Sequence, residues 1–306
     1  MANFQTVQDR ITERYSKIVD RPTDFTKAIN KPLKQSFRVN TIKGKKDEII
    51  NKIKNYDPEI KNVNWCDNAF ISNLTNLGSS IEHFTGQIYI QELTSMMPPI
   101  IAQDLLHKNK VIDCCAAPGS KTTQIADIME NKGHIIANDS RHTRIKSLRG
   151  NLDRLGVTNT TVSLRDFKSF PNTEAELYLV DVPCSSEGTI RKQNAVTRKW
   201  KEKDYERFSK LQKGLLKKAC QMAPKGSTII YSTCTFSPDE NEKIVSEILR
   251  EESIDLKRIS LKGLKTGKGI TEWNGQRYDN EVEKCMRIWP HQNDTDGFFV
   301  ARMEKC

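Results

Sequence analysis

The sequence predicts an α/β protein with a mostly parallel, doubly wound sheet and a smaller α+β domain in front of it. Two observations support this. From about residue 84, short β-branched runs alternate with helical segments, and acidic residues follow three successive runs. Such alternation is typical of parallel sheets, in which ligands bind beyond the carboxyl ends of the strands. We therefore expect the functional site at that edge of the sheet.

Seven strands are expected in the main sheet: residues 111–113, 135–138, 161–164, 177–180, 227–231, 285–288 and 298–301. The last two are close in sequence with a Gly-containing loop between them, which predicts an antiparallel hairpin at the edge. Between strands, the clearest apolar stripe is Tyr205, Phe208, Leu211, Leu215, Ala219 and Met222. Its spacing indicates a helix packed on the core, not a cofactor site.

Residues 1–83 are expected to form the small domain, and residues 84–306 the main one, with the polar segment 78–83 as a loose boundary. Apolar residues recur at three- and four-residue steps at Phe4, Val7, Ile11, Tyr15 and Ile18. This spacing predicts an amphipathic helix. The alternating run 36–42 predicts a strand, and residues 47–56 predict a second helix.

The composition limits the classes of partner that the protein is expected to bind. The chain has 306 residues and a formal net charge of +10 at pH 7. Lysine and arginine release counterions from phosphates, so this balance favours a nucleic acid, although a Lys-rich soluble surface fits the charge equally well. The N-terminus has no apolar core segment, and no run approaches the ~20 apolar residues of a membrane span. We expect a cytoplasmic, monomeric protein without a membrane partner.

Eight cysteines occur, at positions 66, 114, 115, 184, 220, 234, 285 and 306, without any C-x-x-C pair. This pattern argues against a disulfide scaffold and a structural zinc site, so no metal is expected and the thiols are expected to be free. Two of them follow predicted strands: Cys184 comes after 177–180, and Cys234 comes after 227–231. A buried small hydrophobe is the ordinary fate of such residues, and reactive thiols are the alternative.

The segment DCCAAPGSKT follows the first strand of the main sheet. Small residues at Ala116, Ala117 and Gly119 let the backbone approach a ligand, Pro118 fixes the turn, and a helix is expected from about Ser120. Its first amides are free to bind an anionic group. The spacing matches neither G-x-G-x-x-G nor the Walker pattern, so a tight turn without a ligand is the alternative.

Acidic residues follow the second, third and fourth strands, at Asp139, Asp166 and Asp181. Doubly wound folds place an acid after the second strand to bind a ribose diol. Three such acids together favour a nucleoside-containing cofactor.

Five segments, in this order, resemble the signatures of the Nop/Sun family of RNA cytosine-5 methyltransferases: DCCAAPGSKT, NDSRHTR, DVPCSSEGTIRK, YSTCTFSPDENE and RIWPHQNDTDGFFVAR. The resemblance covers the main domain and extends into the first through FRVNTIK and GQIYIQELTSMM, and it is to compact archaeal members acting on tRNA. It implies a Rossmann-like class I fold that uses S-adenosylmethionine. The implied function is methyl transfer to carbon 5 of cytosine in RNA, with tRNA as the favoured substrate and rRNA as the alternative.

The resemblance also implies roles for single residues. The cofactor's methionine part would be held by Cys115, Ala116, Ala117, Pro118, Gly119, Ser120 and Lys121. Asp139 would hold the ribose, Arg144 would contact the cofactor or its acidic partner, and Asp166 would face the adenine. Asp181 would lie between cofactor and base.

Cytosine carbon 5 is a poor nucleophile until a nucleophile adds at carbon 6, and a thiolate both attacks and leaves well. The family assigns the attack to the cysteine of the TC motif, here Cys234, and help with release to that of the PC motif, here Cys184. Asp181 would hydrogen-bond near ring nitrogen 3 if it holds or shares a proton. DNA cytosine methyltransferases attack with the PC cysteine, so having both motifs favours RNA.

Four local expectations complete the picture. The run Ser237-Pro238-Asp239-Glu240 predicts a capping box at a helix start, which would confine Cys234 to a short link. Basic residues in 188–201 form either an RNA contact or a solvated face; these residues are Arg191, Lys192, Arg198 and Lys199, with Trp200 beside them. Ser186 stands where the family generally has Gly, and Thr235 stands where Ser is usual. Either change can alter loop shape.

Two competing classes predict different chemistry. A non-catalytic RNA-binding or ribosome-assembly factor with this fold would not need Asp181, Cys184 or Cys234. A DNA methyltransferase would form its covalent adduct through Cys184.

Overall fold

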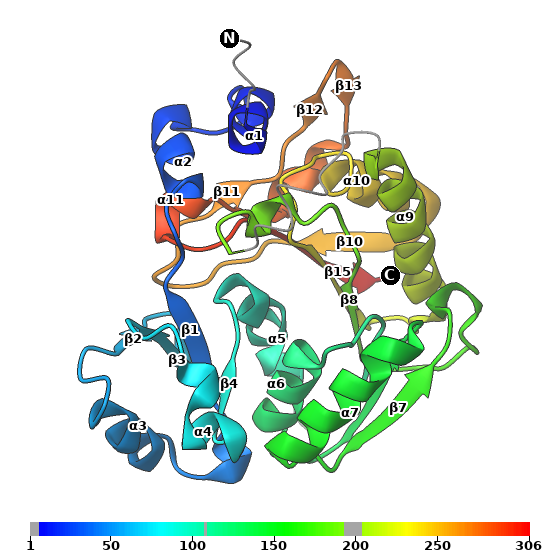
Figure 1. The fold of residues 1–306 in the computed structure, drawn as a ribbon. Coiled ribbons are helices and arrows are strands. Elements are labelled where there is room, and N and C mark those ends of the chain that lie inside the picture. Colours follow the sequence, from blue (N-terminus) through cyan, green and yellow to red (C-terminus); the bar gives the residue numbers. More distant parts are fainter. Residues whose placement is uncertain (1–5, 107–108, 193–203) are drawn as a thin grey trace.

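A computed structural model describes residues 6–106, 109–192 and 204–306. Figure 1 shows a large sheet with helices on both faces, a small sheet beside it, and a short separate hairpin of β12 (Glu272–Trp273) and β13 (Gln276–Arg277). Phe4, expected in the first helix, lies outside the described residues. None of the described helices is long and apolar enough to cross a membrane.

Among the described residues the large sheet has nine strands in the order β11-β14-β15-β9-β8-β5-β6-β7, with β10 also paired to β15. Their bounds are β5 (Lys110–Asp113), β6 (His134–Asp139), β7 (Thr160–Leu164), β8 (Leu177–Asp181), β9 (Thr228–Thr233), β10 (Ile254–Lys257), β11 (Gly267–Lys268), β14 (Met286–Ile288) and β15 (Phe298–Lys305). The five strands from β9 to β7 run parallel, and β15 is antiparallel to both β9 and β14. The expected antiparallel hairpin is therefore confirmed, but its position at the edge is wrong, because β11 pairs with β14 and forms the edge. Strands β10 and β11 were not predicted.

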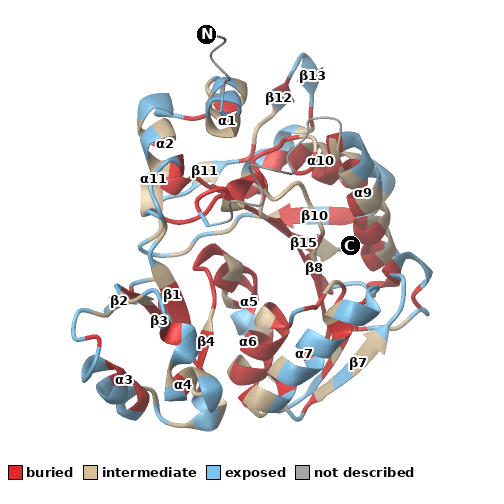
Figure 2. Ribbon diagram, viewed as in Figure 1, coloured by how far each residue is buried: buried red, intermediate tan, exposed pale blue. Residues whose placement is uncertain are grey.

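Helices cover both faces of this sheet: α5 (Met97–Ile101), α6 (Ser120–Ile128), α7 (His142–Leu155), α9 (Asp204–Met222), α10 (Glu242–Glu251) and α11 (Pro290–Asn293). Successive residues of β8 point into different cores, because Leu177 and Leu179 join the cluster around α6, while Tyr178 and Val180 join the one around α9 and α10. The central strands β8 and β9 are therefore buried on both sides (Figure 2). This explains their continuously apolar sequence.

The small sheet has the order β2-β3-β1-β4 and is antiparallel. Its strands are β1 (Gln35–Val39), β2 (Lys61–Val63), β3 (Cys66–Ser72) and β4 (Ile88–Ile90), with helices α3 (Lys46–Lys54) and α4 (Ile81–Phe84). The predicted strand at 36–42 and helix at 47–56 correspond to β1 and α3. Because β4 pairs with β1, this sheet continues past residue 83.

The first two helices, α1 (Val7–Tyr15) and α2 (Pro22–Ile29), lie against the large sheet although we expected them in the small domain (Figure 1). Tyr15 and Phe25 are fully buried in its core. The Phe25 ring packs edge-on against Phe236 and Trp289, with centroids 5.3 and 5.8 Å away. The amphipathic spacing was correct, but it could not indicate which core the apolar face would meet.

A buried arginine joins the two sheets. Arg38 of β1 is 1% exposed, and its guanidinium donates to Thr123 Oγ1 at 2.6 Å and pairs with Asp127 at 3.4 Å, both on α6. The other Asp127 oxygen accepts the backbone N–H of Thr41 at 2.8 Å. Because the ions are desolvated, each one depends on the other.

We expect Arg38→Ala to lower the free energy of unfolding by about 3–5 kcal/mol, since it leaves the Asp127 carboxylate buried without its cation. Urea denaturation followed by circular dichroism measures the change. The matched control is Arg207→Ala, which removes an exposed ion pair to Asp204, and should change stability by less than about 1 kcal/mol. Equal effects of the two substitutions would show that the buried pair does not join the sheets.

Candidate active site

Two thiols meet where neighbouring strands end. β8 and β9 are parallel, with Asp181 paired to Ser232, so that Cys184 and Cys234 leave the sheet side by side. Their sulfur atoms are 3.4 Å apart, and both residues are partly buried. The structure therefore brings together the two cysteines that the sequence placed at strand ends.

The two thiols share one proton unequally. A hydrogen bond from Cys184 lowers the pKa of Cys234 against the effect of burial, and the Lys121 ammonium adds to this. The same hydrogen bond, together with burial, raises the pKa of Cys184 well above its usual value. Of the two thiols, Cys234 is therefore the one that loses its proton more readily, and thiolates are the reactive form.

Lys121 and Asp181 form an ion pair beside the thiols. Lys121 Nζ donates to Asp181 Oδ2 at 2.6 Å and to Ser95 Oγ at 3.1 Å. The second carboxylate oxygen accepts from Ser232 Oγ at 2.7 Å. Burial opposes the charge on Lys121, but the contact with Asp181 outweighs it and raises the pKa of the lysine. The site therefore holds an ion pair close to Cys234, in which Lys121 lowers the pKa of that thiol and Asp181 raises it.

A cavity of about 270 Å³ opens over Cys234, Lys121 and Asp181. Its other wall includes residues 89–92, 94 and 95, which follow or belong to β4 of the small sheet, and it is closed by Asp296 and Phe298 at the start of β15. Sequence reasoning missed Glu92 and Asp296 as members of this site. Both lie inside segments that resemble the family, but only the fold brings those segments to Cys234.

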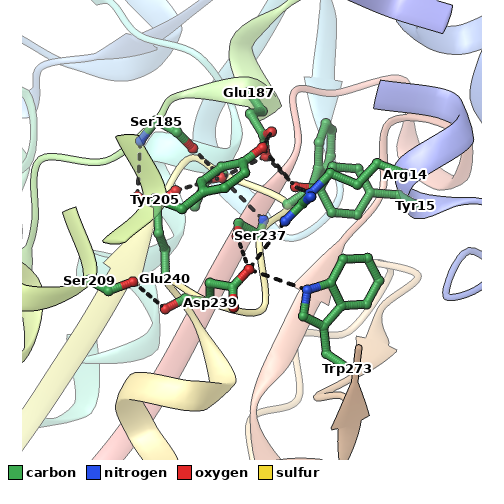
Figure 3. A network of polar contacts seen from close by, with 12 residues as sticks. Arg14, Tyr15, Ser185, Glu187, Tyr205, Ser209, Ser237, Asp239, Glu240 and Trp273 are labelled. Carbon is green, nitrogen blue, oxygen red and sulfur yellow. Dashed lines mark hydrogen bonds and ion pairs between the residues drawn. The ribbon is translucent and has the colours of Figure 1, made fainter. Parts of the chain in front are cut away.

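Polar contacts fix the two cysteine loops (Figure 3). Glu187 is fully buried and accepts from Tyr15 OH at 2.7 Å, from Thr235 Oγ1 at 3.0 Å and from Tyr205 OH. Ser185 and Thr235, the residues after the two cysteines, join through their hydroxyls at 2.7 Å. The loops are thus tied to each other and to α1 and α9.

Glu240 supports the same loops, in a role that differs from the prediction. Its carboxylate accepts from the Ser185 N–H at 3.0 Å and from Gln212 Nε2 at 2.7 Å. Burial, with the nearby charge of Glu187, raises its pKa to about 7. The predicted capping box is wrong, since residues 238–241 form a turn and α10 begins at Glu242 with Asn241 as N-cap. Cys234 still lies in the link between β9 and α10.

The two departures from the family pattern lie in the cysteine loops. Ser186 has φ +60° and ψ +21°, a left-handed conformation that favours glycine, so a serine here costs roughly 1 kcal/mol. Thr235 keeps the hydroxyl of a serine and accepts the Ser237 N–H at 3.2 Å. Ser186 therefore has a backbone conformation that glycine adopts more easily, at some expense in stability.

Two glycines join three loops at the site. The Gly188 N–H donates to Cys234 O at 3.0 Å, and the Gly297 N–H donates to Gly188 O at 2.9 Å. A Cβ on Gly188 would lie 2.3 Å from Gly297 O and 2.8 Å from Cys234 O. Only glycine permits this approach.

The segment 115–121 forms the turn from β5 into α6, which begins at Ser120 as predicted. Gly119 has φ +103°, and a Cβ there would lie 2.8 Å from Leu148 Cδ1. Asp139, at the end of β6, is buried and accepts from the N–H groups of Ala117 at 3.3 Å and Arg141 at 3.0 Å. Arg144 pairs with Asp139 at 3.0 Å. Of the two contacts expected for Arg144, with the cofactor or with its acidic partner, the structure has the second.

The residues here fit S-adenosylmethionine. Asp113 Oδ1, at the end of β5, is buried and has no hydrogen-bond partner among the described residues, while Oδ2 accepts from Thr122 Oγ1 at 2.6 Å. Burial raises the pKa of Asp113 to about 7. The first amides of α6 supply donors without intrahelical acceptors. Acceptor and donors at one strand end suit a ligand that carries both an ammonium and a carboxylate.

Two expected residues lie elsewhere. Asp166 is exposed beyond β7 and caps a short turn through the Lys168 N–H at 3.0 Å. Arg191 was a candidate RNA contact, and this is wrong: its side chain is buried and donates to Thr295 O at 2.9 Å and Asp294 Oδ1 at 2.5 Å. Lys192 is exposed at the cavity. Arg198, Lys199 and Trp200 lie outside the described residues.

The protein has a doubly wound sheet with this turn after its first strand, an acid after its second strand, and a thiol pair beyond its fourth and fifth strands. This combination defines the class: an S-adenosylmethionine-dependent methyltransferase. The model described as 16S rRNA methyltransferase RsmB/F matches residues 101–304, and the N-terminal domain of 16S rRNA methyltransferase RsmF matches residues 8–93. The chain belongs to this RsmB/F family, which confirms the resemblance.

Two relatives differ in how much of their own length this chain covers. A tRNA (cytosine(49)-C(5))-methyltransferase of Pyrococcus abyssi is 38% identical over 99% of this chain and 97% of that protein. A ribosomal RNA small subunit methyltransferase F of Vibrio cholerae is 35% identical over 95% of this chain, which spans only 62% of that protein.

Solved structures give the same result. A methyltransferase homolog protein from Pyrococcus horikoshii superposes with a TM-score of 0.85 at 31% identity, covering 97% of this chain and 95% of that one. NSun6 from the same organism, with SFG, reaches 0.81 at 21% identity and 98% of both chains, which shows the fold alone. The chain is thus an S-adenosylmethionine-dependent RNA (cytosine-5) methyltransferase, and the expected enzyme class and cofactor are confirmed.

We expect Cys184→Ala to raise the pKa of Cys234, because the thiolate loses its hydrogen-bond donor. Alkylation by iodoacetamide at a series of pH values, followed by peptide mass spectrometry, should show half-maximal Cys234 labelling at higher pH in the variant than in the unaltered protein. Cys306→Ala removes an exposed thiol and should leave the Cys234 profile in place. An unchanged profile in Cys184→Ala would contradict the shared proton.

Proposed function

We propose that this protein methylates carbon 5 of a cytosine in tRNA, with Cys234 as the attacking nucleophile and Cys184 as the group that assists release. The observation that carries this proposal is the thiol pair, with 3.4 Å between its sulfurs, at a cavity that also holds the Lys121–Asp181 ion pair. A non-catalytic RNA-binding factor would gain nothing from a thiolate in this position.

The attack requires a thiolate that faces the base. Cys234 lines the cavity, and its charge is stabilised by the Cys184 S–H and the Lys121 ammonium. Addition of this sulfur to carbon 6 breaks the aromaticity of the ring and makes carbon 5 nucleophilic. Cys184 has a raised pKa and holds its proton, so it is the poorer nucleophile of the two.

Release requires that the sulfur leave carbon 6 again. When Cys234 departs it regains negative charge, and the Cys184 S–H within hydrogen-bond reach stabilises that charge. Without Cys184 the adduct persists. This explains why the site contains Cys184 in addition to Cys234.

When bound, S-adenosylmethionine supplies an electrophilic methyl group to carbon 5. Residues 115–121 and Asp113 would hold its methionine part, and Asp139 would hold its ribose. Asp181 lies at the cavity between this turn and Cys234, where its ion pair with Lys121 orients both side chains. A contact between Asp166 and the adenine is a proposal that rests on the family resemblance alone.

The target cytosine has to leave its stack, because a cavity walled by both domains admits a single base and not a duplex. The formal charge of +10 favours the RNA backbone, and Lys192 stands at the cavity as one cation in reach of it. Free thiols at the site require a reducing compartment, so we infer that the protein acts in the cytoplasm.

We favour tRNA over rRNA because the Pyrococcus abyssi relative, matched over 97% of its length, is named for cytosine 49 of tRNA. The rRNA enzyme of Vibrio cholerae is matched over 62% of its length. Cytosine 49 is accordingly the first position to examine.

Incubation of the protein and S-adenosylmethionine with a pool of unmodified tRNA transcripts should produce 5-methylcytosine at a defined position, read by bisulfite sequencing. An equal amount of small-subunit rRNA transcript serves as the competing substrate. Methylation of the rRNA alone would reject the tRNA proposal, and methylation of neither would reject the function.

Cys234→Ala should reduce methyl transfer by roughly 10³-fold or more, since it removes the nucleophile. With transcripts that contain 5-azacytidine, this variant should form no covalent complex, whereas Cys184→Ala should accumulate more complex than the unaltered protein. Peptide mass mapping identifies the attached residue. A complex linked through Cys184 would reverse the two roles and point to the chemistry of DNA methyltransferases.

A further inference from the structure

Asp296 is an acid at the active-site cavity that has no assigned part in the reaction. It lies just before β15, the neighbour of β9, and lines the same cavity as Cys234, Lys121 and Asp181. The Gly297 N–H that donates to Gly188 O fixes the backbone beside it. Its position is therefore set by the same contacts that hold the cysteine loops.

The Asp296 side chain is buried, yet one of its oxygens is unmatched. It is 2% exposed, and Oδ1 has no hydrogen-bond partner among the described residues. The described residues also contain no ion pair that includes Asp296. Since buried polar atoms are nearly always paired, an unmatched oxygen at a cavity wall suits a partner that arrives with the ligand.

A second carboxylate lies next to it. Glu92 Oε1 accepts the Asp296 backbone N–H at 3.1 Å, and Glu92 Oε2 accepts the Thr94 N–H at 2.7 Å. Burial, and then the negative charge of Glu92, raise the pKa of Asp296 to about 9, while Lys192 and Arg191 oppose this and Cys234 adds to it. At neutral pH Asp296 is thus a carboxylic acid with a proton to donate.

Asp181 is less suited to supply a proton. Its two oxygens already accept from Lys121 and from Ser232, at 2.6 and 2.7 Å. An ion pair with an ammonium is made by a carboxylate, which accepts but does not donate. The family pattern assigns the neighbourhood of ring nitrogen 3 to this residue, but the occupied oxygens of Asp181 favour another group as the proton donor.

We propose that Asp296 donates the proton that nitrogen 3 of the cytosine takes up when Cys234 adds to carbon 6, and that it takes this proton back on release. The inference rests on the proposed function. It makes Asp296 a catalytic residue in contact with the base, and leaves Asp181 to hold Lys121.

The proton balance of the step is complete. As the Cys234 sulfur bonds to carbon 6, the C5=C6 pair moves to C4–C5, the C4=N3 pair moves to nitrogen 3, and the Asp296 O–H proton binds there. Asp296 becomes a carboxylate. When carbon 5 takes the methyl group, the C4=C5 pair forms the new bond and the nitrogen 3 pair restores C4=N3, which is still protonated. A water molecule then accepts the carbon 5 proton, the C5–H pair forms C5=C6, and the C6–S bond breaks to release the Cys234 thiolate. The N3–H proton returns to the Asp296 carboxylate.

The test uses Asp296→Asn, which keeps the size and hydrogen bonds of the side chain but has no proton to transfer. Single-turnover methyl transfer to the tRNA transcript pool should fall by about 10²–10⁴-fold, the usual contribution of general acid catalysis. The dissociation constant for the same transcripts and the thermal unfolding midpoint should stay close to those of the unaltered protein. Asp255→Asn, an exposed acid on β10, is the matched control and should retain full activity.

The pH profile separates a catalytic acid from a structural one. Methyl transfer by the unaltered protein should decline as the pH rises through about 9, where Asp296 loses its proton, and Asp296→Asn should lack this decline. Asp181→Asn should be slower at every pH, with the decline still present.

Each outcome decides the matter. Full activity of Asp296→Asn, or a decline that disappears in Asp181→Asn instead, overturns the proposal while the proposed function stands. If Asp296→Asn unfolds, Asp296→Glu provides the second test, since it retains the acid and must retain the alkaline decline. Failure of the unaltered protein to methylate cytosine overturns both.

Discussion

The adjacency of two parallel strands is the constraint on which the site depends. Because β8 and β9 pair with Asp181 opposite Ser232, the residues that follow them have to emerge together, and the two sulfurs come within 3.4 Å. Their contact lowers the pKa of Cys234 and raises that of Cys184.

Much of the site followed from the sequence, because strand ends on a parallel sheet gather at one edge. This rule placed Cys184, Cys234 and Asp181 together and put the turn 115–121 beside them. It failed for Arg191, whose basic character indicated a surface although its partners, Asp294 and Thr295, lie far along the chain. Charge in a sequence does not reveal a buried partner.

The same limit explains the other errors. The four residues from Ser237 have the composition of a capping box. Glu240 instead accepts hydrogen bonds from Ser185 and Gln212, and only the tertiary structure brings these residues to it. The apolar stripe of α1 was recognised, yet its attachment to the large sheet depends on Tyr15 reaching Glu187. Glu92 and Asp296 were missed because their significance lies in their proximity, across more than two hundred residues.

The shared wall of the cavity has a consequence for how the enzyme handles its product. Residues 89–95 close one side of the pocket and the turn into α6 closes another, while Arg38 ties the two together beneath it. A base enclosed in this way can depart only through the mouth by which it entered, or after the two halves separate. Exchange of the base would then depend on the two walls moving relative to each other, which the Arg38–Asp127 pair restrains.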